Sequence, residues 1–223
     1  MLDCLIYILR KIGLSDDVIK QKLIGITTDG ASENMGNKGG LWEKLKKWLE
    51  RQILTVWCFC HRSDLAIEDL EESVSELGIW KSNLTSLASY YRKSGKKTKS
   101  LKKHGAKREF PAHHEVRFAQ HLGALITAAI DNMEACKKHW NEISNTRGVD
   151  KKEKAKAVGF LKTWDKSNLQ MQITVLMGDV LEIFQELQKQ CQREHIILPD
   201  IFKYRDHAVT NLRLMSNSAY PGE

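Results

Sequence analysis

Proline is scarce in this sequence, with three residues in 223, which favours long helices over an architecture of short strands and turns. No apolar run approaches the roughly 20 residues that a membrane-spanning helix needs, so we expect no membrane partner. The N-terminus lacks the basic start and the small-residue cleavage site of a signal peptide. The five cysteines are odd in number and scattered, and therefore indicate reduced intracellular thiols rather than a disulfide framework.

Strand and helix patterns alternate in the first third of the chain. Two short runs rich in β-branched residues, 23–28 and 53–58, predict buried strands. Helical stripes follow them at about 41–51 and 61–77, and the glycine-rich stretch 29–40 predicts a loop. This alternation predicts an α/β unit with parallel strands.

Helical patterns dominate elsewhere. Residues 2–12 predict an amphipathic helix, and Ser15 with the two aspartates after it predicts the cap of a second short turn. After residue 78 the strand patterns stop, and from His195 onward we expect irregular structure. Between these points apolar residues recur at helical spacing over 80–91, 118–143, 158–164 and 173–191. The predicted fold class is therefore α/β followed by a mostly α-helical region, helix-dominated overall.

Residues 92–108, the basic strip, hold nine basic residues and no acidic one. The strip contributes +9 to a formal net charge of +7, so the other residues sum to −2. Charge gathered in one segment suits a polyanion such as nucleic acid, and Tyr90, Tyr91 and His104 would allow stacking with bases. A solvated loop and a nuclear-import signal are the alternatives. The basic residues are Arg92, Lys93, Lys96, Lys97, Lys99, Lys102, Lys103, Lys107 and Arg108.

Asp29 stands where the first predicted strand meets the glycine-rich loop. A carboxylate there can reach the sheet-edge cleft in which α/β proteins bind ligands, and metal-dependent phosphoryl transfer uses carboxylates in groups of two or three. The alternative, which spacing alone favours, is an aspartate that hydrogen-bonds its own loop. Cys58, Cys60 and His61 suggest zinc by residue type, but no second ligand pair accompanies them, which favours a packed thiol and a histidine at the strand–helix junction.

Three segments carry motifs whose order and spacing fit a known family. They are GITTDGASENM at 25–35, CFCHRSDLA at 58–66 and EVRF at 115–118, the last approached through YRKSGKK at 91–97. Together they resemble hAT-family transposases and the host proteins derived from them. The first looks like the strand that carries the second catalytic aspartate, the second is similar to the C-x-x-H segment and its helix, and the third resembles the Arg-Trp motif.

The resemblance implies an RNase H-like core that is interrupted by a large all-helical insertion domain. On that basis residues 1–91 are a partial, incomplete RNase H-like α/β segment and residues 92–114 a basic connector. Residues 115–215 are then the helical region that begins the insertion domain, and residues 216–223 a frayed tail.

The family cuts and joins DNA at a site where two aspartates and a glutamate hold two ions of Mg²⁺ or Mn²⁺. Asp29 matches the middle acid, His61 matches the histidine of C-x-x-H, and Phe118 stands where the family has a tryptophan that stacks on a flipped base. The upstream strand with the first aspartate and the returning glutamate are not found in these 223 residues. Because one carboxylate cannot hold two metal ions, we expect Asp29 and His61 to be remnants, with no cofactor and no nuclease activity.

The leading hypothesis is a truncated, catalytically inactive transposon-derived domain in the nucleus that binds DNA or other nucleic acid without sequence preference. One alternative is a helical scaffold for a protein partner or self-association, whose stripe from Ile173 to Cys191 would be exposed. Others are a fragment of a longer, active transposase and a decayed copy without function. The expected contacts to nucleic acid are Lys96, Lys97, Lys99, Lys102, Lys103, Lys107, Arg108, Arg117 and Phe118.

Overall fold

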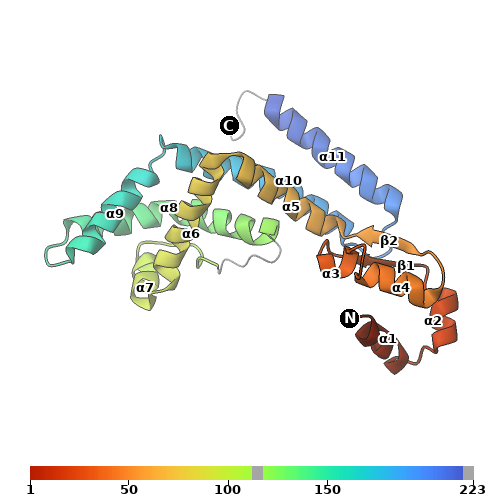
Figure 1. Ribbon diagram of the computed structural model, residues 1–223. Coiled ribbons are helices and arrows are strands. Elements are labelled where there is room, and N and C mark those ends of the chain that lie inside the picture. Colours follow the sequence, from red (N-terminus) through yellow and green to blue (C-terminus); the bar gives the residue numbers. More distant parts are fainter. Residues whose placement is uncertain (112–117, 218–223) are drawn as a thin grey trace. The chain divides into compact units, whose positions relative to one another are not determined.

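The computed structural model describes residues 1–111 and 118–217, and it is mostly helical, with 74% helix. Over these residues there are eleven helices and one two-stranded parallel sheet near the N-terminus (Figure 1). The prediction of a helix-dominated chain with a small parallel α/β part is therefore confirmed. The chain divides into an N-terminal unit, Met1–Leu65, and a helical unit that begins at Ala66.

The N-terminal unit alternates short helices with two strands. In chain order its elements are α1 (Leu2–Lys11), α2 (Asp16–Lys22), β1 (Gly25–Thr28), α3 (Ser32–Met35), α4 (Leu41–Leu49), β2 (Leu54–Trp57) and the start of α5 (Phe59–Ser73). The strands are parallel, with Gly25 opposite Leu54 and Thr28 opposite Trp57. Ser15 Oγ accepts a hydrogen bond from the Val18 amide at 3.3 Å, which confirms the predicted cap of α2.

The stretch 29–40, predicted as a loop, contains the short helix α3, so that prediction is wrong in part. Tight turns flank α3 because glycines let the chain approach itself. A Cβ atom on Gly30 would lie 2.6 Å from the Trp57 ring, and one on Gly40 would lie 2.5 Å from the Gly36 nitrogen. Both contacts are shorter than van der Waals packing allows, so these positions require glycine.

The core of the N-terminal unit is small. Leu45, Leu49 and Ile53 are buried at its centre, and partly buried side chains such as Leu5 and Ile26 pack against them. The Arg51 guanidinium adds a polar link, because it donates hydrogen bonds to the backbone carbonyls of Lys20 and Leu23 at distances between 2.5 and 3.0 Å. These contacts join the segment between α4 and β2 to the C-terminal end of α2.

The helical unit holds the remaining helices. They are α6 (Ser75–Arg92), α7 (Gly95–Lys103), α8 (Phe118–Asn145), α9 (Lys151–Thr163), α10 (Leu169–Cys191) and α11 (Leu198–Asn217). Within this unit α10 packs along α8, α9 packs on α8, and α11 packs on α10. The helix predicted over 61–77 is two helices, because Val74 is extended (φ −124°, ψ 101°) and separates α5 from α6.

The core of the helical unit is built from the predicted apolar stripes. Trp80, Trp140 and Trp164 are almost wholly buried, and the Trp80 indole N–H donates to Thr174 Oγ1 at 2.8 Å. The stripe from Ile173 to Cys191 supplies core residues, among them Ile173, Met177 and Leu187, which are 7%, 4% and 7% exposed. The expectation that this stripe is exposed for a partner is therefore wrong.

Two segments expected to be irregular are helical. The basic strip, expected as a connector, contains α7, and the segment after His195 forms α11. Pro199 is compatible with α11 because it lies in the first helical turn, where its missing N–H leaves no bond unmade. The predicted frayed tail lies outside the described residues apart from its first two positions. No helix in residues 1–111 or 118–217 is both long and apolar enough to pass through a bilayer.

Candidate nucleic-acid interface

Helix α7 arranges the middle of the basic strip. It begins because Ser94 Oγ accepts the Lys97 amide at 3.4 Å, and it docks by burying Leu101, which is 3% exposed. Lys96, Lys99 and Lys103 follow one another at spacings of three and four residues, so they share one face of the helix. All three are exposed, and we call them the α7 face.

Ion pairs remove part of the strip's charge from the interface. Lys97 lies 2.9 Å from Glu153, Lys102 lies 2.6 Å from Glu109, and Arg108 pairs with Asp131. Six basic residues of the strip form no ion pair within the described part of the chain: Arg92, Lys93, Lys96, Lys99, Lys103 and Lys107. The sequence prediction treated Lys97, Lys102 and Arg108 as equal to the others, whereas the structure gives them acidic partners.

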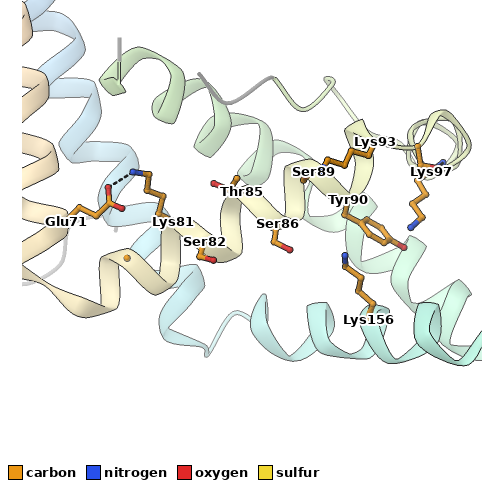
Figure 2. A pocket seen from close by; sticks show the side chains of 12 residues that line it. Glu71, Lys81, Ser82, Thr85, Ser86, Ser89, Tyr90, Lys93, Lys97 and Lys156 are labelled. Carbon is orange, nitrogen blue, oxygen red and sulfur yellow. Dashed lines mark hydrogen bonds and ion pairs between the residues drawn. The ribbon is translucent and has the colours of Figure 1, made fainter. Parts of the chain in front are cut away.

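A groove of about 790 Å³ runs along α6 and ends at the start of α7 (Figure 2). Its floor is a row of small hydroxyl side chains on one face of α6: Ser82, Thr85, Ser86 and Ser89. Lys93, Lys97 and Lys156 surround Tyr90 at one end, and Lys81 pairs with Glu71 at the other at 2.7 Å. We call this feature the α6 groove.

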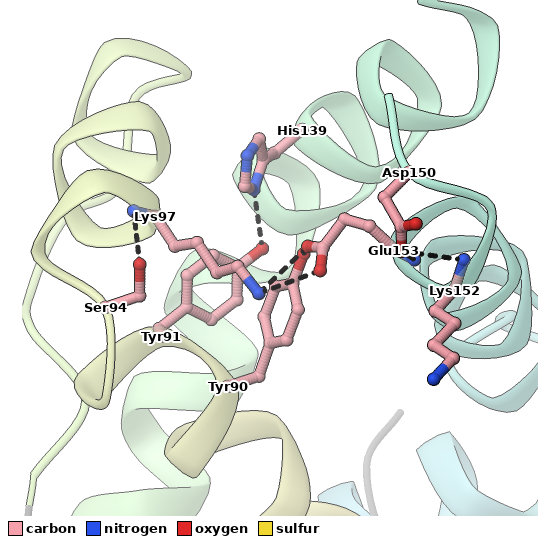
Figure 3. Close-up of polar contacts among 8 residues, drawn as sticks. All are labelled: Tyr90, Tyr91, Ser94, Lys97, His139, Asp150, Lys152 and Glu153. Carbon is pink, nitrogen blue, oxygen red and sulfur yellow. Dashed lines mark hydrogen bonds and ion pairs between the residues drawn. The ribbon is translucent and has the colours of Figure 1, made fainter. Parts of the chain in front are cut away.

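Lys97 takes part in a structural network (Figure 3). Its Nζ lies 3.7 Å from the centre of the Tyr90 ring, and the Tyr90 hydroxyl donates a hydrogen bond to the Glu153 carboxylate. Burial would raise the pKa of Glu153, but hydrogen bonds from Tyr90 and Lys97 and the charges of Lys97 and Lys156 outweigh it and lower that pKa. The network therefore joins α6, α7 and α9 through an ionised carboxylate.

A second buried contact adds no positive charge to this region. Tyr91 Oη and His139 Nδ1 lie 3.1 Å apart and share a hydrogen bond. Burial, together with the charge of His104, lowers the pKa of His139, so its ring is neutral at neutral pH. Burial also raises the pKa of the Cys136 thiol to about 12, which keeps that thiol protonated.

The predicted aromatic stacking is wrong for both tyrosines. Tyr90 is 5% exposed and Tyr91 is 1% exposed, because their rings pack against Phe160 and Phe110 inside the helical unit. His104 is engaged as well, with Nε2 2.9 Å from Glu142. Neither tyrosine therefore offers a free ring face to a base.

Asp29, in the N-terminal unit, hydrogen-bonds its own loop. Its Oδ1 accepts the Ala31 amide at 3.1 Å and the Asn34 side-chain amide at 2.6 Å. These two bonds, and then the charge of His61, lower the pKa of Asp29. No group of three or more His, Cys, Asp or Glu in the described residues is placed to hold a metal ion. A lone carboxylate engaged by its loop does not fit a two-metal site.

Two predicted contact residues are not placed by the structure. Arg117 lies outside the described residues, and Phe118 begins α8 with a side chain that the structure does not describe. Sequence reasoning missed the acidic partners Glu153 and Asp131 and the hydroxyl row of α6. The hydroxyl row had a usable signal, because residues 82, 85, 86 and 89 follow helical spacing.

Neither a protein-family model nor a solved structure matches the chain. A function is therefore inferred from the residues and contacts described above.

Proposed function

We propose that this chain is a catalytically inactive, transposon-derived domain that binds DNA or other nucleic acid without sequence preference through the α7 face. The observation that supports it is the alignment of Lys96, Lys99 and Lys103 on one exposed helix face. None of the three forms an ion pair within the described residues, so each ammonium group is free for a phosphate.

Lysine is suited to this role because its ammonium group binds phosphate as a point charge and displaces condensed counterions. From Lys96 to Lys103 the helix rises about 10 Å, which is comparable to the span of a few phosphates along one strand. Lys93 and Lys107 extend the positive charge beyond both ends of the α7 face. Contacts from lysines to phosphate oxygens carry no sequence information, so we expect binding without sequence preference.

The catalytic part of the proposal depends on the hAT resemblance. These 223 residues offer Asp29 for one of the three acids of a two-metal site, and its carboxylate is bound within its own loop. By themselves they would therefore carry no nuclease activity. The RNase H-like ancestry of the N-terminal unit and a nuclear location belong to the same proposal.

The test is fluorescence anisotropy of the whole chain with a labelled DNA duplex over a salt series. We expect the triple variant K96A/K99A/K103A to bind at least about tenfold more weakly at moderate salt. Its plot of log affinity against log salt should be shallower by about three, because three phosphate contacts are lost.

The matched control is K38A/K44A/K47A, which removes three exposed lysines from the N-terminal unit. Both triple variants lower the formal net charge from +7 to +4. If binding depended on overall charge alone, the two variants would weaken it equally, and the proposed interface would be rejected.

A protein-interaction role is a second candidate function, favoured by α11. Leu198, Phe202 and Val209 recur on one face of this helix and are 49%, 47% and 38% exposed. An exposed apolar face is typical of a surface that another protein covers.

A further inference from the structure

In the described part of the chain, the hydroxyl groups of the α6 groove lack a backbone bond that several hydroxyls on other helices form. Thr98 donates to Ser94, Thr127 to Gly123 and Thr174 to Gln170, at 2.7 to 3.2 Å. Over the described residues no hydrogen bond joins Ser82, Thr85, Ser86 or Ser89 side chains to another protein atom. Four donors on one helix face are therefore available to a ligand.

The lysines that line the groove indicate that the ligand of these hydroxyl donors is an anion. Lys93, which follows the last residue of α6, and Lys156, in α9, are both exposed, and both line the groove with Lys97 near Tyr90 (Figure 2). Hydroxyl and ammonium groups are both donors to an anionic oxygen. Among the described residues, Glu71 is the only carboxylate that lines the groove, and Lys81 neutralises it at 2.7 Å.

The volume of the α6 groove and the side chains that line it limit the class of ligand that it can hold. A volume of about 790 Å³ is that of a small-molecule or single-chain site, and it is too small for a duplex. Side chains that could hold apolar ligand groups are few, since Tyr90 is 5% exposed and the floor is hydroxyl-bearing. Repeated anionic groups along one flexible chain fit this lining best.

We propose that the α6 groove holds the sugar–phosphate backbone of a single nucleic-acid strand, which continues onto the α7 face. This inference rests on the proposed function and names its substrate as single-stranded rather than duplex. From Ser82 to Lys93 the helix rises roughly 16 Å, enough for about three to five phosphates. Hydroxyls would donate to phosphate oxygens along the floor, and Lys93 and Lys156 would supply charge at the end near α7.

The test compares a thymidine oligonucleotide of about 20 residues with a duplex of the same length, by anisotropy of the whole chain at equal salt. The groove variant is S82A/S86A, because both serines are exposed and alanine favours helix. We expect it to bind the single strand about tenfold more weakly and the duplex within about twofold of the unaltered chain. The variant K93A/K156A should also weaken single-strand binding more than duplex binding. Its affinity for the single strand should depend less steeply on salt, because two charges are lost.

The matched control is S82T/S86T, which keeps both hydroxyls and should retain single-strand binding. Equal loss for single strand and duplex in the alanine variant, or no loss for either, overturns the groove assignment. A different result would reject the proposed function, namely unchanged binding of both DNAs by the variant K96A/K99A/K103A. Circular dichroism of each variant verifies that α6 remains folded.

Discussion

At the scale of single residues, Lys97 and Lys96 are neighbours in the basic strip with different roles. Lys96 is exposed on the α7 face, whereas Lys97 lies 2.9 Å from Glu153 and against the ring of Tyr90. Changing Lys97 would therefore disturb packing as well as charge. Variants meant to test nucleic-acid binding should leave Lys97 in place.

Glu153 gives a stability prediction. The Glu153→Gln variant should lower the free energy of unfolding at pH 7 by about 1–2 kcal/mol, since charge-assisted hydrogen bonds from Tyr90 and Lys97 are weakened. The pKa of Glu153 is lowered in the folded state, so this stabilisation is present above its ordinary pKa and is lost as the pH falls through the lowered value. Urea unfolding at pH 7 and at about pH 3.5 measures the difference.

The control for this prediction is Glu109→Gln. Glu109 also pairs with a lysine of the strip, Lys102 at 2.6 Å, but both side chains are more than half exposed. An exposed pair of this kind contributes little, so the variant should unfold at nearly the same urea concentration as the unaltered chain. A Glu153→Gln penalty that persists undiminished at the acidic pH would contradict the ionised network.

At the scale of elements, the sequence predicted the helices that bury a continuous apolar stripe. Ile173, Met177 and Leu187 predicted α10 because core contacts repeat with the helical period. Helix α7 gave no such signal, since Leu101 is its only buried residue and its other positions are polar. Its helical state depends on the Ser94 cap and on docking against the helical unit.

The candidate site could be predicted only in part for a similar reason. Charge density along the sequence located the basic strip, but which lysines are free depends on partners distant in sequence. Glu153 is 56 positions from Lys97 and meets it only after α9 packs on α8. The segment's net charge therefore overstated the charge of the surface.

Helix α11 provides the prediction for the second candidate function. If its apolar face mediates self-association, sedimentation velocity will show a concentration-dependent dimer, and Phe202→Glu will make the chain monomeric by placing a charge on that face. Leu214 is 63% exposed and lies on roughly the opposite side of the same helix. Leu214→Glu should therefore leave the dimer intact, and an equal effect of both changes would exclude this face.

At the scale of the whole molecule, two apolar cores share no residue. One is centred on Leu45, Leu49 and Ile53, and the other contains residues between Ile67 and Leu181. We expect scanning calorimetry to resolve two unfolding transitions, the lower one from the N-terminal unit, because a core of that size stabilises only marginally.

Two core truncations assign the transitions. Leu45 and Leu84 are both 0% exposed, so each change to alanine should cost about 2–5 kcal/mol in its own unit. Leu45→Ala should shift the lower transition alone, and Leu84→Ala the upper one alone. A single transition that both variants shift would show that the units unfold together.

The parallel sheet has a consequence for the order in which the N-terminal unit forms. Gly25 pairs with Leu54, 29 positions later, so the first ladder bond requires closure of a long loop through α3 and α4. Ordering that loop costs chain entropy before any strand bond compensates it. Helices α6 and α7, by contrast, meet each other within a short stretch of sequence. The sheet is therefore the kinetically late element of the N-terminal unit, and β1 remains unpaired on a nascent chain until β2 has been made.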